Sequence, residues 1–186
     1  MSPSQIPNLI CVLRIVLVLP IVWALVEEEY GLTLVLFAVA ALSDGLDGFL
    51  AKNFGWHTEV GALLDPIADK LLLVSVFLAL TYLGMIPVWL MVVVVARDII
   101  IVSGALGYQY LIGPVEARPT GVSKINTGLQ LAYVLAVVAY SGYGWPTSGE
   151  VLALGSTMFV TTVVSGMDYV WSWGRRAWQV GQTEQG

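Results

Sequence analysis

Charged residues are scarce in this sequence. Only 11% of the 186 residues are charged, whereas 58% are hydrophobic, and the mean hydropathy is +0.82. A soluble domain carries about twice that charged fraction, so the composition excludes a water-soluble globular protein. Cysteine and histidine each occur once: Cys11 cannot form a disulfide framework, and His57 alone makes no metal site. No basic segment precedes the first apolar run, so we expect no removable targeting peptide.

Long apolar runs make up most of the chain. A helix of about 20 apolar residues crosses a bilayer, and six runs approach that length. Their expected ranges are 9–26, 32–51, 61–83, 88–110, 125–140 and 151–169. We see no internal repeat and no soluble domain. The sequence therefore predicts an all-α integral membrane protein with six transmembrane helices in a single domain, residues 1–186.

The positions of lysine and arginine predict the orientation of these spans. The loops after the first, third and fifth runs contain no base, whereas those after the second, fourth and sixth contain Lys52, Arg118, Lys124, Arg175 and Arg176. Bases gather on the cytoplasmic side of membrane proteins. We therefore expect both termini in the cytoplasm, and a basic, Trp-rich tail, "WSWGRRAW", anchored at the interface. We expect a bacterial inner membrane and no nucleic-acid partner.

Four aspartates lie where lipid is expected. Asp44 and Asp47 are three residues apart at the end of the second run, and Asp65 and Asp69 are four apart at the start of the third. Residues at these spacings share a helix face, so we expect the two pairs to face each other across the packed second and third spans. A single acid is often only a helix contact, but nearby bases are too few to neutralise four. Two divalent cations held by shared carboxylates would explain the cluster, and this is a recurring device in phosphoryl transfer.

The stretch from Asp44 to Asp69 resembles the signature of the CDP-alcohol phosphatidyltransferase family. It reads Asp44-x2-Asp47-Gly48-x2-Ala51-Lys52-x8-Gly61-x3-Asp65-x3-Asp69, and only Lys52 departs, because the family usually has arginine there. The resemblance implies a six-helix membrane enzyme, usually a homodimer, that transfers a phosphatidyl group from CDP-diacylglycerol to an alcohol and releases CMP. It also implies two Mg²⁺ or Mn²⁺ ions.

The resemblance also implies roles for individual residues. The metal ligands would be Asp44, Asp47, Asp65 and Asp69, and Asp69 would also be the general base that accepts the proton of the acceptor hydroxyl. The CDP-diacylglycerol site would contain Asp44, Asp47, Gly48, Lys52 and Thr58. Lysine is a compact charge without the planar fork of arginine. We therefore expect the pyrophosphate contact of Lys52 to survive with less geometric control.

The acceptor must be inferred from other stretches. "IPNLICVLRI" is similar to both cardiolipin synthases of the eukaryotic type and phosphatidylglycerophosphate synthases, while "ARPTGVSKINTGLQL" favours the former. The predicted acceptor is therefore phosphatidylglycerol and the product cardiolipin. Arg118 and Lys124 would bind its phosphate beside a small polar surface (Thr120, Ser123, Asn126 and Thr127), although both bases also fit plain positive-inside residues. Arg97 and Asp98 are adjacent and should not face each other on a helix: Arg97 either snorkels or joins the polar site, and Asp98 needs its own partner.

Two alternative functions remain open at this point. The first is a phosphatidylglycerophosphate synthase, which would use glycerol 3-phosphate as its acceptor. The second is a cation-binding membrane transporter, because intramembrane carboxylates also mark ion pathways. The absence of a visible inverted repeat, and acids near one membrane face rather than the midplane, count against the transporter.

Overall fold

The computed structural model describes the backbone of residues 6–54, 59–111 and 121–183, and the side chains of residues 10–43, 68, 70–104 and 121–171. Within these ranges all regular structure is helical. The helices are α1 (Ile6–Val26), α2 (Tyr30–Phe54), α3 (Glu59–Tyr82), α4 (Val88–Leu111), α5 (Gly121–Tyr143) and α6 (Ser148–Thr183). The prediction of an all-α chain is confirmed, and the first five helices begin and end within a few residues of the expected limits.

The sixth helix is longer than we predicted. We expected it to end near residue 169, but α6 continues to Thr183 through the Trp-rich basic segment. No proline follows residue 146, so the backbone meets no strong helix breaker there. The segment interpreted as an interfacial tail is therefore part of the helix.

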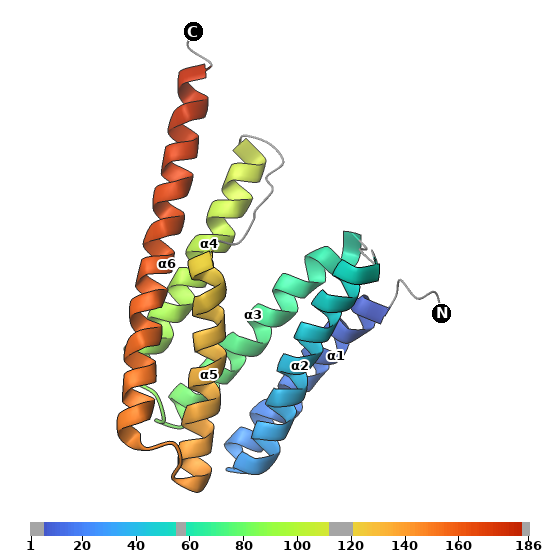
Figure 1. Cartoon of the computed structure of the whole chain (residues 1–186), viewed down its shortest axis with the longest axis vertical. Helices are drawn as coiled ribbons and strands as arrows, with labels where there is room; N and C mark the ends of the chain where they lie inside the picture. Colours follow the sequence, from blue (N-terminus) through green and yellow to red (C-terminus); the bar gives the residue numbers. More distant parts are fainter. Residues whose placement is uncertain (1–5, 55–58, 112–120, 184–186) are drawn as a thin grey trace.

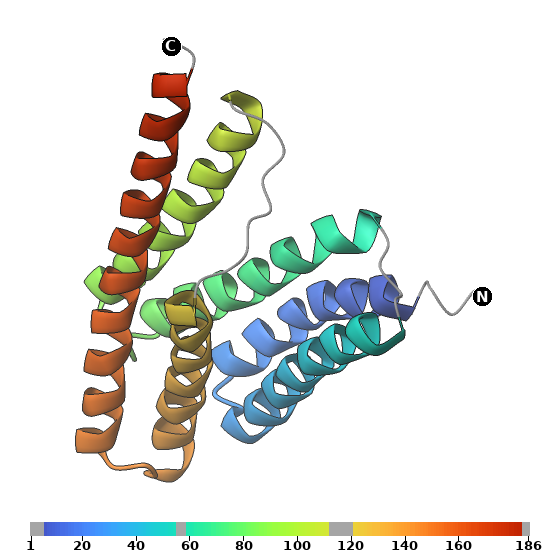
Figure 2. The same cartoon turned by 45° about the horizontal axis from the view of Figure 1, so that its top comes forward.

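Consecutive helices run in opposite directions. Figures 1 and 2 show that the connections from α1 to α2, from α3 to α4 and from α5 to α6 lie at one end of the molecule. Left-handed backbone at Glu28, Gly84 and Gly144, with φ of 60°, 72° and 69°, stops the helices at these three turns. A capping box then starts α6, because Thr147 N donates to Glu150 Oε2 (2.7 Å) and Glu150 N donates to Thr147 Oγ1 (3.4 Å).

The core joins two groups of helices. α1 packs against α2 and α3, α6 packs against α4 and α5, and α5 also contacts α2 and α3; Figure 1 shows α5 between the two groups. Glycine allows the closest approaches. A Cβ on Gly142 would lie 2.6 Å from Tyr30 Cβ, and one on Gly155 would lie 2.7 Å from the ring of Tyr133. Close helix contacts of this kind are typical of membrane bundles.

The outer surface is apolar. Large hydrophobic side chains such as Leu19 (75% exposed), Val35 (61%) and Leu152 (72%) point outward on different helices. In the described part of the chain, α5 and residues 148–171 of α6 are long and apolar enough to cross a membrane. An outer surface this apolar is suited to contact with lipid rather than with water.

Candidate functional site

The two acid-bearing segments lie at the same end of the molecule. Asp44 and Asp47 lie in the second half of α2, and Asp65 and Asp69 in the first half of α3. Figure 1 shows the end of α2 and the start of α3 at the same end of the molecule, and Figure 2 shows the start of α1 between them. The side chains of these four residues and of Lys52 lie outside the described residues, as does Gly48 apart from its helical backbone. Thr58 and Arg118 lie outside them entirely.

α1 occupies much of the space that we predicted for direct packing of α2 on α3. Over the described residues α1 contacts both helices along their length, whereas contacts between α2 and α3 themselves are scarce. α1 brings in a base that the sequence reasoning missed: Arg14, whose side chain is 1% exposed. Its only signal in the sequence was a single cation inside an apolar run. α1, α2 and α3 contain five acids in all, and four of them are the aspartates of the signature.

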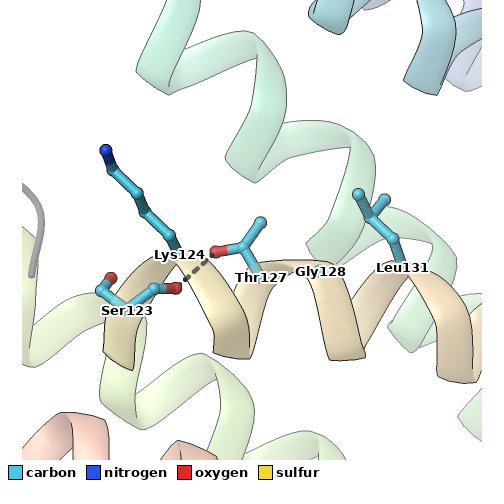
Figure 3. A pocket seen from close by; sticks show the side chains of 5 residues that line it. All are labelled: Ser123, Lys124, Thr127, Gly128 and Leu131. Atoms are coloured by element: carbon cyan, nitrogen blue, oxygen red, sulfur yellow. Dashed lines mark hydrogen bonds between the residues drawn. The ribbon is translucent and has the colours of Figure 1, made fainter. Parts of the chain in front are cut away.

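A pocket opens at the start of α5. Its lining residues are Ser123, Lys124, Thr127, Gly128 and Leu131, and its volume is about 340 Å³. Figure 3 shows Lys124, Thr127 and Leu131 projecting from the same side of the helix. Lys124 is exposed and Ser123 buried, while Thr127 Oγ1 donates to the Ser123 carbonyl oxygen (3.2 Å). The polar groups therefore lie toward the start of the helix, and Leu131 provides an apolar inner end.

Asn126 does not belong to this pocket, although we predicted it on the same polar surface. It is fully buried, and its Oδ1 accepts hydrogen bonds from Thr161 Oγ1 and Thr162 Oγ1 of α6, each at 2.9 Å. The physical reason is helical geometry. Ser123, Thr127 and Leu131 follow one stripe of α5, while Asn126 turns about a third of a circle away from it toward α6. Asn126 therefore joins two helices.

A buried charged cluster connects four helices behind the pocket. Arg97 and Asp98 of α4 are 4% and 5% exposed. Asp98 Oδ1 accepts hydrogen bonds from Arg97 NH1 and from Lys70 Nζ of α3, both at 2.7 Å. Arg97 NH2 also donates to Ser123 Oγ of α5 (2.6 Å) and to Ser165 Oγ of α6 (2.7 Å). The cluster therefore ties α4 to each of its neighbours.

Of the two alternatives for Arg97, the structure favours the second. Arg97 does not snorkel, because its guanidinium is buried and hydrogen bonded to Asp98, Ser123 and Ser165, and Ser123 lines the polar pocket. One expectation is wrong: Arg97 does pair with the adjacent Asp98, because its long side chain can reach back to it, which Cα positions alone do not reveal. The expectation that Asp98 needs a further partner is confirmed by Lys70, a residue that the sequence reasoning passed over.

The sequence of this chain is similar to those of several known proteins. The sequence model of the family described as CDP-alcohol phosphatidyltransferase matches residues 4–167. The cardiolipin synthase (CMP-forming) of Homo sapiens is 31% identical over 195 aligned residues, which cover 96% of this chain and 64% of that protein. The chain thus spans somewhat less than two thirds of the human relative.

Bacterial relatives carry two different names. The cardiolipin synthase (CMP-forming) of Streptomyces coelicolor is 33% identical over 154 residues, covering 77% of this chain and 69% of that protein. The probable phosphatidylglycerophosphate synthase of Mycobacterium tuberculosis is 35% identical over 139 residues, covering 73% of this chain and 62% of that protein. Similarity of this kind does not separate the two acceptors.

Proposed function

The chain belongs to the CDP-alcohol phosphatidyltransferase family, and we propose that it transfers a phosphatidyl group from CDP-diacylglycerol to phosphatidylglycerol. The products would be cardiolipin and CMP. The observation that carries the choice of acceptor is the pocket at the start of α5, together with the relatives named cardiolipin synthase. Family membership makes a cation transporter the weaker account of the aspartates.

The pocket suits a lipid acceptor. Lys124 supplies one cation beside two hydroxyl groups at the polar end, and Leu131 and the backbone of Gly128 line the rest of the pocket. A phosphodiester carries a single negative charge, and it arrives within the bilayer with an acyl chain attached. An apolar wall beside the polar end matches that ligand better than glycerol 3-phosphate, which arrives from water and carries no acyl chain. Arg118, six residues before Lys124 in the sequence, would contribute a second base.

The donor set of α2 and α3 fits two divalent cations. Asp44, Asp47, Asp65 and Asp69 offer only carboxylate oxygens, the ligands that Mg²⁺ and Mn²⁺ prefer, and their helix segments lie at the same end of the molecule. We propose that these four residues hold the metals. Bound there, the ions would neutralise the pyrophosphate of CDP-diacylglycerol and the charge that develops on the transferred phosphate.

The protein's own residues then supply binding and proton transfer. In our proposal Asp44, Asp47, Gly48, Lys52 and Thr58 border the cytidine diphosphate group, and Lys52 opposes its negative charge. The Asp69 carboxylate accepts the proton of the acceptor hydroxyl as that oxygen bonds to the phosphatidyl phosphorus. The bond from this phosphorus to the CMP phosphate oxygen breaks, and CMP leaves with the electron pair.

The second candidate is phosphatidylglycerophosphate synthesis from glycerol 3-phosphate, favoured by the relative in Mycobacterium tuberculosis. One experiment decides between them. Purified protein in lipid nanodiscs receives CDP-diacylglycerol, Mg²⁺ or Mn²⁺, and either phosphatidylglycerol or glycerol 3-phosphate, and mass spectrometry identifies the product. Asp69→Asn protein is the control for background turnover. Phosphatidylglycerophosphate without any cardiolipin would refute our choice of acceptor.

We also propose the arrangement in the membrane. Six spans with both termini in the cytoplasm would place the acids and the α5 pocket on the cytoplasmic side of a bacterial inner membrane. In support, α2 and α6 end, and α5 begins, toward the same end of the molecule (Figure 1), and Lys52, Arg175, Arg176 and Lys124 lie in those segments. A homodimer is expected from the family resemblance. Labelling of single cysteines from each side, and native mass spectrometry, test these two proposals.

A further inference from the structure

The charged cluster behind the pocket contains two cations, Arg97 and Lys70, but one anion, Asp98. Arg97 and Asp98 form a buried pair that is neutral by itself. Lys70 adds a second cation 2.7 Å from the same carboxylate oxygen, which leaves the three side chains with a net charge of +1. Arg97 is buried, whereas Lys70 is 28% exposed, so the second positive charge lies at the accessible edge of the cluster. An anion beyond Asp98 could therefore bind there.

The geometry of Lys70 is that of a cation held in place for another group. Within the described part of the chain, Asp98 Oδ2 is buried without a hydrogen-bond partner, while both cations use Oδ1. A lysine present only to balance Asp98 would gain more from the vacant Oδ2. The Lys70 side chain is 28% exposed, and an ammonium group has three donors, of which Asp98 takes one. The rest of its hydrogen-bonding capacity remains open to a ligand.

The surroundings indicate where that anion binds. Lys70 follows Asp69 directly in α3, so it lies at the depth of the proposed general base. On its other side the cluster reaches the α5 pocket, because Arg97 donates to Ser123 Oγ and Ser123 lines the pocket. With its free glycerol hydroxyl at Asp69, a phosphatidylglycerol molecule would have its phosphate a few bonds away, between Lys70 of α3 and Lys124 of α5.

We propose that Lys70 is a phosphate-binding residue of the acceptor site, with Asp98 as the residue that positions its ammonium group. This inference rests on the proposed function. The phosphodiester of the lipid acceptor is the favoured anion, since the cluster leads to the α5 pocket. The pyrophosphate of CDP-diacylglycerol shares the same chemistry, and the experiment separates the two sources.

The test compares steady-state KM values for both substrates in nanodiscs containing full-length protein. Lys70→Met removes the ammonium and leaves the neutral Arg97–Asp98 pair intact. We expect the KM for phosphatidylglycerol to rise about 10- to 100-fold, as for loss of a charge-assisted hydrogen bond, while the KM for CDP-diacylglycerol changes less than about threefold. Lys70→Arg should restore most of the affinity. Arg176→Met, which removes one positive charge from the end of α6, is the matched control.

Each other outcome overturns the inference. An unchanged KM for phosphatidylglycerol in Lys70→Met, or an equal rise in Arg176→Met, removes the acceptor contact. A rise confined to CDP-diacylglycerol assigns the ammonium to the donor instead. If the wild type uses only glycerol 3-phosphate, the proposed acceptor fails separately, and the same variants are measured against that substrate. Should Lys70→Met not fold, Lys70→Gln replaces it under the same criteria.

Discussion

The buried cluster makes a quantitative prediction about stability, because its three charged members differ in what each leaves behind. Asp98→Asn removes the only anion and leaves Arg97, 4% exposed, beside Lys70 without a counter-charge. Breaking a buried pair from one side costs about 3–5 kcal/mol. Lys70→Met leaves Arg97 and Asp98 paired, and Lys70 is partly exposed, so we expect a loss of about 1 kcal/mol. For Arg97→Met we expect a loss of stability between these two values. Lys70 still pairs with Asp98 in that variant, but Ser123 and Ser165 lose a hydrogen-bond donor.

The assay is reversible unfolding in mixed micelles of mild detergent and dodecyl sulfate, followed by the fluorescence of the seven tryptophans. The expected order of destabilisation is Asp98→Asn, then Arg97→Met, then Lys70→Met. A triple variant with apolar residues at 70, 97 and 98 should regain much of the stability, since replacing a whole buried ionic group by apolar residues is often neutral. Equal losses for Asp98→Asn and Lys70→Met would refute the reasoning.

Four further predictions concern the acids, the bases and the packing. Chelation by EDTA should abolish CMP release and Mg²⁺ or Mn²⁺ should restore it; full activity in metal-free buffer would remove the two-metal proposal. Asp69→Asn should lower kcat by about 10² to 10⁴-fold or more, since it removes a general base; near-normal turnover would move the base elsewhere. Lys52→Ala should raise the KM for CDP-diacylglycerol while Lys52→Arg should not, and equal values in both variants would make Lys52 a plain positive-inside residue. Gly142→Ala should lower the free energy of unfolding by about 1–3 kcal/mol, because the new Cβ would lie 2.6 Å from Tyr30 Cβ. The control Gly149→Ala should leave it unchanged, because nothing lies within 4 Å of the new Cβ. Equal stability of the two variants would show that α2 and α5 can shift apart.

Sequence patterns predicted the helices well because apolar runs and turn residues act locally. Left-handed backbone at Glu28, Gly84 and Gly144 stops three helices, and the sequence signals these ends by the charged run at 27–29 and by the two glycines. The end of α6 was missed because arginines and tryptophans between residues 170 and 178 indicate an interface without breaking a helix. The residue types of such a segment indicate that it lies at the membrane interface, but they do not show whether it is helical.

The polar contacts inside the bundle were harder to predict. Lys70, Arg97, Ser123 and Ser165 come from four helices, and they meet only because of how α3, α4, α5 and α6 pack. Nothing in the sequence near Ser165 indicates a partner 68 residues away. The signature, by contrast, contains all of its acids within one short stretch of the sequence, residues 44–69, so its spacing could be interpreted directly. Local motifs reveal the chemistry, whereas packing decides which helices support it.

Arg14 changes the charge balance on which the two-metal interpretation depends. The four aspartates were assigned to metals because nearby bases were too few, yet Arg14 is buried on the helix that packs against both α2 and α3. A buried guanidinium needs an anion, and apart from Glu59 those two helices offer only the four aspartates. Even with Lys52 counted beside Arg14, two bases leave an excess of two negative charges among four carboxylates. Divalent cations therefore remain our proposal for balancing this charge, and Arg14 would reduce the repulsion among the carboxylates before the cations bind.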